Sequence, residues 1–117
     1  MKKKILIIDD EEDVRSYITE VLVAEGYEVA TASDGLQGLD EMRSFRPDLV
    51  TLDLQMPNDT GTGFYRKIHR DREFADVPII VISGIAGRHL AIRKPFAVLD
   101  KPIDRQHLLD VVRDAIG

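Results

Sequence analysis

The stretch that decides the fold is PDLVTLDLQMP, residues 47–57. Its centre, Leu49 to Leu52, is a short apolar run, and runs of this length and composition suit strands that are buried on both faces. The run ends at Asp53, and an unpaired carboxyl group at the end of a buried strand is energetically costly. The stretch therefore predicts a buried parallel strand that carries an acid to a functional site.

Four similar runs lie on either side of this strand, and helical patterns separate them. The runs cover residues 5–8, 27–32, 79–82 and 96–99. Apolar residues recur at the spacing of one helix face in residues 14–22, 36–42, 64–68 and 108–116. Strands that alternate with helices imply an α/β fold, in which a parallel sheet has helices on both faces. Residues 84–95 are the least regular segment, and we expect a short or irregular helix there.

Polar side chains stand where the apolar runs end. Asp9 and Asp10 follow the first run, Ser83 follows the fourth, and Lys101 comes shortly after the fifth. Open parallel sheets bind ligands beyond the carboxyl ends of their strands. If the strand order is 2-1-3-4-5, the first and third strands are neighbours. Asp9, Asp10 and Asp53 then converge on one cleft, with Ser83 and Lys101 beside them.

Three carboxylates in one cleft resist being ionised together, and a hard cation relieves their repulsion. Carboxylate and carbonyl oxygens suit Mg²⁺, which often bridges to a phosphoryl oxygen. A carboxylate such as Asp53 can also attack phosphorus and form an aspartyl phosphate. Such a transfer needs positioning and charge stabilisation. Mg²⁺, the ammonium group of Lys101 and the hydroxyl group of Ser83 would supply that stabilisation.

Length and composition narrow the class of protein further. The chain has 117 residues, which fit one ordinary domain. The absence of cysteine excludes disulfides, thiolate metal sites and thiol nucleophiles. A net charge of −5 disfavours holding nucleic-acid phosphates by charge. The apolar runs are too short for a signal peptide or a membrane span. We therefore expect a cytoplasmic protein that binds neither membrane nor nucleic acid directly.

The sequence resembles a response-regulator receiver domain of two-component signalling, of the CheY-like kind. The resemblance covers the whole chain, so we expect a single receiver domain at residues 1–117. It rests on motifs that occur in the family order and at family-like spacing: Ile8-Asp9-Asp10-Glu11, residues 47–57, Gly61, residues 78–84 and Lys101-Pro102. It implies a flavodoxin-like, doubly wound, five-stranded parallel sheet with the strand order 2-1-3-4-5.

The resemblance also implies a metal site and an acceptor. Asp53 matches the phosphoacceptor of the family and one of its metal ligands. Asp10 matches the direct Mg²⁺ ligand, and Asp9 matches the acid that holds the metal largely through water. The backbone carbonyl of Gln55 matches the third protein ligand.

Further positions match the switching part of the family, and two features depart from it. Ser83 matches the hydroxyl residue that binds the phosphoryl group, Lys101 matches the lysine that pairs with it, and the bond before Pro102 is cis in the family. The usual switch aromatic is replaced by Val98, although Phe96 lies two residues earlier on the same strand face. The stretch from Ser83 to Lys101 is also several residues shorter than usual.

The resemblance implies a phosphorylation-controlled switch rather than an enzyme, since such domains promote only their own phosphorylation and dephosphorylation. A sensor histidine kinase or a phosphotransfer protein would supply the phosphoryl group to Asp53, with Mg²⁺ required. A downstream protein target would read the state, because no effector domain is expected in this chain. A homodimer is left open.

Alternative interpretations remain at this stage. A degenerate receiver could act only as a protein-docking module, which Val98 and the shortened segment favour. A metabolite phosphatase of the haloacid-dehalogenase type would carry a second aspartate where this chain has Gln55. A flavin-binding flavodoxin would need a phosphate cradle where residues 9–13 are all acidic. Asp10 and the acids after it could also simply cap the following helix.

Overall fold

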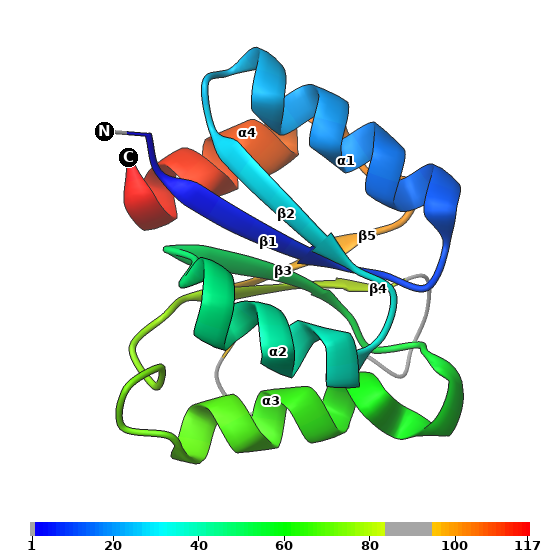
Figure 1. Ribbon diagram of the computed structural model, residues 1–117. Helices are drawn as coiled ribbons and strands as arrows, with labels where there is room; N and C mark the ends of the chain where they lie inside the picture. Colours follow the sequence, from blue (N-terminus) through cyan, green and yellow to red (C-terminus); the bar gives the residue numbers. More distant parts are fainter. Residues whose placement is uncertain (1, 84–94) are drawn as a thin grey trace.

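The computed structural model describes residues 2–83 and 95–117. Its five strands form one parallel sheet with the order β2-β1-β3-β4-β5, which confirms the predicted α/β fold and strand order (Figure 1). The strands are β1 (Lys4–Ile8), β2 (Glu28–Ala32), β3 (Leu49–Asp53), β4 (Ile79–Ser83) and β5 (Ala97–Asp100). Because all five strands run in the same direction, their carboxyl ends lie along one edge of the sheet.

Helices cover both faces of this sheet. Helices α1 and α4 pack on one face, and α2 and α3 pack on the other (Figure 1). The helices are α1 (Glu12–Ala24), α2 (Gly35–Phe45), α3 (Thr60–Arg70) and α4 (Arg105–Ile116), with a short 3-10 turn, η1 (Pro57–Asp59), before α3. Residues 84–94, on which the expectation of a short helix falls, lie outside the described residues. None of the helices in the described part of the chain combines the length and apolar character that a membrane crossing needs.

The core consists of two apolar layers, one on each side of the sheet. Every residue of β3 and β4 is buried, as the continuous apolar runs predict. Successive strand residues alternate between the layers, so Leu49 packs toward α1 and α4 whereas Val50 packs toward α2 and α3. Each fully buried aliphatic side chain contributes about 1.5–3 kcal/mol relative to exposure. This two-sided burial holds the central strands, and hence their carboxyl ends, in fixed positions.

One helix end follows a local sequence rule, and one predicted helix face is wrong in part. Helix α1 stops before Gly26, whose φ of +93° is the left-handed geometry that glycine adopts without strain. In α2, Leu36 was expected on the apolar face but is 63% exposed. The buried stripe of α2 instead contains Gly35, Gly38 and Met42. The glycines let the helix approach closely, since a Cβ on Gly38 would lie 2.5 Å from Cδ1 of Ile8.

Candidate functional site

Three carboxylates meet at the carboxyl edge of the sheet, as predicted. Asp53 ends β3 and is 1% exposed, while Asp9 follows β1 and is 2% exposed. Asp10 is exposed, and each of the three acids offers an oxygen atom within 4.8 Å of the others. Both Asp9 and Asp10 can reach one cluster because β1 ends at Ile8 and the chain then turns. The N-cap residue of α1 is Glu11, so Asp10 does not cap this helix.

Lys101 brings the positive charge to this cluster. It follows β5, and its Nζ lies 3.2 Å from Oδ2 of Asp9 and 3.5 Å from Oδ2 of Asp53. Its Nζ also lies 3.2 Å from Oε1 of Glu11, a residue that was not among the predicted site residues. The peptide bond between Lys101 and Pro102 is cis, as the resemblance implies.

Hydrogen bonds from the backbone orient the two buried acids. The amide of Gln55 donates to Oδ1 of Asp53 at 2.9 Å, so Gln55 contacts the site through its N–H. The amide of Glu11 donates to Oδ1 of Asp9 at 2.8 Å. The guanidinium group of Arg15 donates to the carbonyl oxygen of Asp9 at 2.7 Å. Arg15 was not among the predicted site residues, and no sequence pattern signals a side chain that reaches back six residues to a backbone carbonyl.

Ser83 lies at the end of β4, beside both the buried acid and the lysine. It is fully buried and stands one residue beyond Ile82, the register partner of Asp53. Its carbonyl oxygen accepts a hydrogen bond from the amide of Lys101 at 3.1 Å, which ties the ends of β4 and β5 together. The structure thus brings the side chains of Asp9, Asp10, Asp53 and Lys101 into one cluster, with Ser83 at the end of the adjoining strand and the backbone N–H of Gln55 on Asp53.

The electrostatics of the site favour a bound cation. Burial raises the pKa of Asp53 to about 6, the Gln55 amide opposes this rise, and the charge of Asp9 adds to it. Burial also raises the pKa of Asp9. For Lys101, burial lowers the pKa, but the charges of Asp53 and Asp9 outweigh it, so the net pKa is raised. Two buried acids with raised pKa values are ionised at a cost, which a nearby cation would reduce.

The donor set fits a hard divalent cation. Carboxylate oxygens from Asp9, Asp10 and Asp53 are the kind of ligand that Mg²⁺ prefers, and the exposure of Asp10 leaves a path from solvent. Mg²⁺ usually keeps several waters, so three protein carboxylates with an open side suit it better than a closed cage. The residues present therefore fit the metal that the sequence predicts.

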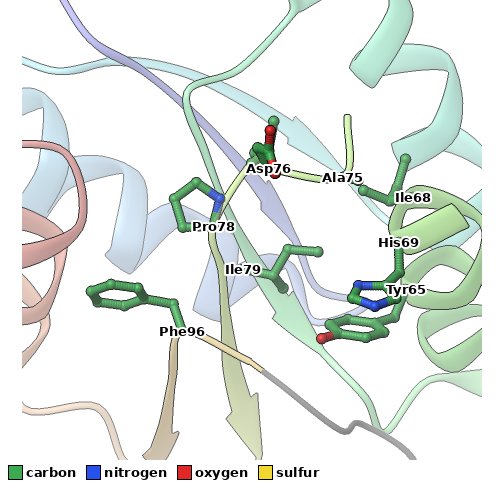
Figure 2. Close-up of a pocket in the computed structure, with 9 residues that line it drawn as sticks. Tyr65, Ile68, His69, Ala75, Asp76, Pro78, Ile79 and Phe96 are labelled. Carbon is green, nitrogen blue, oxygen red and sulfur yellow. The ribbon is translucent and has the colours of Figure 1, made fainter. Parts of the chain in front are cut away.

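A hollow lies at the edge of the sheet where the strands begin, opposite the acidic cluster. Its volume is about 300 Å³, and Figure 2 shows Phe96 on one side and the ring pair of Tyr65 and His69 on the other, with Ile79 between them. The rings of Tyr65 and His69 stack with their centroids 5.7 Å apart. Ile79 begins β4, so this hollow is remote from the acids at the carboxyl ends. Phe96 and Val98 are 46% and 40% exposed, so both lie at the surface.

Comparison with known proteins agrees with this geometry. The chain matches the family "Response regulator receiver domain" over residues 5–113. It is 29% identical to the polar-differentiation response regulator DivK of Brucella anthropi, over 100% of this chain and 98% of DivK. It is 35% identical to the CAI-1 autoinducer sensor kinase/phosphatase CqsS of Vibrio cholerae, over 95% of this chain but only 17% of that protein. Its relatives thus include both small proteins and segments of much larger ones.

A solved structure adds a relative with a metal. The receiver domain of the sensor histidine kinase PA1611 from Pseudomonas aeruginosa PAO1 has a magnesium ion coordinated in its active site cleft. It superposes with a TM-score of 0.88 at 25% sequence identity, over 100% of this chain and 99% of that one. The family match, the strand order and the acidic cluster together show that this chain belongs to the response regulator receiver domain family of two-component signalling.

Proposed function

We propose that this receiver accepts a phosphoryl group on Asp53 from a sensor histidine kinase or a phosphotransfer protein, in a Mg²⁺-dependent reaction, and thereby switches a contact with a protein target. The observation that carries the proposal is the setting of Asp53. It is a buried acid with one oxygen facing Lys101, and two further acids lie within reach of the same cation. Phosphoryl transfer to a carboxylate needs this combination of a positioned nucleophile and concentrated positive charge.

The step uses the side chain of Asp53 as the nucleophile. A carboxylate oxygen forms a bond to phosphorus, the bond from phosphorus to the donor breaks, and the electron pair leaves with the donor. The pKa of about 6 means that Asp53 is mainly ionised at pH 7, so the nucleophile is available. The Gln55 amide fixes Oδ1, and Lys101 lies on the side of Oδ2, where it would neutralise charge on the phosphoryl group.

The metal would be held by the acids at the sheet edge. Asp9, Asp10, Asp53 and the backbone carbonyl of Gln55 would hold Mg²⁺, which supplies charge stabilisation for the phosphoryl oxygens when bound. The chain itself orients the carboxylates through the amides of Glu11 and Gln55. This role requires no binding site for a separate substrate. We therefore propose that the chain promotes only its own phosphorylation and dephosphorylation and is not an enzyme in the usual sense.

The switch would begin at Ser83 and Lys101. A phosphoryl group carries about −1.5 to −2 charge in place of the single charge of the ionised carboxylate, and it brings three strong acceptor oxygens. Ser83 ends β4, the strand beside that of Asp53, and the ammonium group of Lys101 lies 3.5 Å from Oδ2 of Asp53, so both could donate to the phosphoryl group. Their rearrangement would bias the segment after β4, and a partner would read that change.

A donor protein would approach along the same edge. An apolar hollow of about 310 Å³ borders Lys101 and is lined by Val14 and Tyr17 of α1 and by Pro102 and Ile103. The hollow offers apolar contact area beside an otherwise charged site, which is what a protein carrying a phosphohistidine would need.

The direct test is incubation with acetyl phosphate and Mg²⁺, followed by intact-mass measurement. The wild-type chain should gain one phosphoryl group, and chelation of Mg²⁺ should abolish the gain. Asp53→Asn should gain none. An equal adduct on Asp53→Asn, or no adduct on the wild-type chain, would contradict the proposal.

A second candidate is a docking module that ignores phosphorylation. The exposed aliphatic Val98 favours it, because the position of the usual switch aromatic then carries no ring that could change its burial. Partner binding measured with and without beryllofluoride separates the two candidates. Unchanged binding supports the docking module, and changed binding supports the switch.

A further inference from the structure

The ammonium group of Lys101 is saturated with carboxylates. An ammonium group has three N–H donors and no acceptor. Nζ of Lys101 has three acidic oxygens around it: Asp9 Oδ2 at 3.2 Å, Glu11 Oε1 at 3.2 Å and Asp53 Oδ2 at 3.5 Å. A phosphoryl oxygen that is to bind Lys101 must therefore take the place of one of these three carboxylates.

Glu11 is the carboxylate that can leave. The side chains of Asp9 and Asp53 are 2% and 1% exposed, and backbone amides hold both of them. The side chain of Glu11 is 62% exposed, so water can solvate it when it moves away. Displacement of either buried acid would leave a charge without its partner in the protein interior, which is far more costly.

Within residues 2–83 and 95–117, the side chain of Glu11 makes no hydrogen bond or ion pair other than the one with Lys101. It is the N-cap residue of α1, yet its side chain makes no capping hydrogen bond. Asp and Ser are good N-cap residues because their short side chains reach back to the first turn, and Glu is not among the preferred types. The contact with Lys101 joins residues 90 positions apart in the chain, so helix geometry does not impose it.

We propose that Glu11 restrains Lys101 in the unphosphorylated chain and competes with the phosphoryl group for its ammonium. This inference rests on the proposed function of Asp53. Glu11 acts as a positioning residue: it sets how readily Lys101 becomes available, and its negative charge also opposes a phosphoryl group that arrives beside it. Removing the charge of Glu11 should therefore speed adduct formation and tighten the binding of a phosphoryl mimic.

The experiment compares Glu11→Gln with Glu12→Gln. Glu12 is also exposed and lies in the first turn of α1, so its substitution removes the same charge from almost the same place. No ion pair within the described residues involves Glu12, which makes it a matched control. Adduct formation from acetyl phosphate is followed by intact mass, and beryllofluoride affinity by amide NMR, both with Mg²⁺ at fixed ionic strength.

Glu11→Gln should raise the adduct rate and the beryllofluoride affinity about two- to fivefold, the range expected for a partly exposed ion pair. Glu12→Gln should stay close to wild type. Equal increases in both variants would assign the effect to net charge alone and overturn the proposal. A decrease in Glu11→Gln would overturn it too, because Glu11 would then be holding Lys101 in its productive place.

A separate measurement tests the contact without any phosphodonor. In spectra of chains with ¹³C-labelled lysine, the Cε signal of Lys101 should shift in Glu11→Gln and stay in place in Glu12→Gln. If the Cε signal of Lys101 does not shift in Glu11→Gln, the proposal that Glu11 restrains Lys101 is wrong. A wild-type chain that forms no adduct would overturn the proposed function, whereas an active wild type with equal rates in Glu11→Gln overturns only the role of Glu11.

Discussion

At the scale of single residues, Asp53 is held in a setting that opposes its own charge. It is 1% exposed, it accepts one backbone hydrogen bond, and Asp9 adds repulsion nearby. Lys101 offsets part of this cost but shares its ammonium group with two other acids. The chain without metal therefore gives up stability to keep a reactive carboxylate in place.

This cost predicts how Asp53→Asn changes stability. The folded pKa of about 6 lies above the unfolded value near 3.9, so folding favours the protonated acid. The contribution of Asp53 to stability is fully present below about pH 4 and is lost as the pH rises through 6. Without Mg²⁺, the unfolding free energy of Asp53→Asn at pH 8 should exceed that of wild type by about 3 kcal/mol, and the difference should shrink by pH 5.

Urea denaturation in chelator across this pH range provides the measurement. Addition of Mg²⁺ at pH 8 serves as the control, because it should narrow the difference by stabilising only the wild-type acid. A difference that is the same at pH 5 and pH 8 would show that the ionisation of Asp53 is not its cause.

Sequence reasoning found the residues whose place follows from strand ends. Asp9, Asp53 and Ser83 could be predicted because a parallel sheet brings such positions to one edge. The roles of Glu11 and Arg15 could not, because they depend on where long side chains reach across the site. His69 had no partner that sequence alone could name, and it stacks on Tyr65.

At the scale of elements, the start of α3 is pressed against the end of β3. A Cβ added to Gly61 would lie 2.6 Å from the carbonyl oxygen of Asp53 and 3.1 Å from Cα of Leu54. Both of these are backbone atoms, so neither can move without shifting Asp53, the proposed phosphoacceptor. Gly61 therefore sets the spacing between the helix and the residue that carries the proposed chemistry.

Gly61→Ala should destabilise the chain by about 1–3 kcal/mol, the usual effect of an overpacked contact. Gly63→Ala is the matched control on the same helix, since a Cβ there meets nothing within 4 Å. It should stabilise the chain by about 0.5–1 kcal/mol, because alanine is the better helix former. Thermal and urea unfolding of the two variants provide the comparison. Similar stabilities for both would contradict the close approach of α3 to β3.

Element types and order were predictable, but details of packing were not. The strands were predicted from apolar runs, yet β3 and β4 each extend one residue further, onto Asp53 and Ser83. The apolar pattern stops at a polar residue, although the backbone of that residue still pairs with the neighbouring strand, so the pattern places the strand end one residue too early. The inner face of α2 was misjudged at Leu36, because the close contacts are made by glycines, which carry no hydrophobic signal.

At the scale of the whole molecule, metal binding at the acidic edge would raise the stability of the fold. A ligand that binds only the folded chain stabilises it by mass action, by about 1.4 kcal/mol at ten times its Kd. Mg²⁺ should therefore raise the unfolding free energy of the wild-type chain at neutral pH. Asp10→Asn should lose most of this gain, and because Asp10 is exposed the substitution should leave the core intact.

The measurement is urea unfolding at a series of Mg²⁺ concentrations. Sodium chloride at matched ionic strength controls for simple screening among the acids. An equal gain from sodium chloride, or a full gain in Asp10→Asn, would contradict specific binding at the carboxylate cluster.

The site is also assembled from distant parts of the chain, since Lys101 and Glu11 are 90 residues apart in sequence. Closing a loop of this length costs more entropy than closing a short one, and Lys101 reaches the acids only when β5 pairs with β4, so these contacts require the assembled sheet. A partly folded chain in which β5 has not docked on β4 would have the acids without their counter-charge. Only a chain with β5 in place could then accept a phosphoryl group efficiently. Partly folded chains would not be phosphorylated and would not act on a partner.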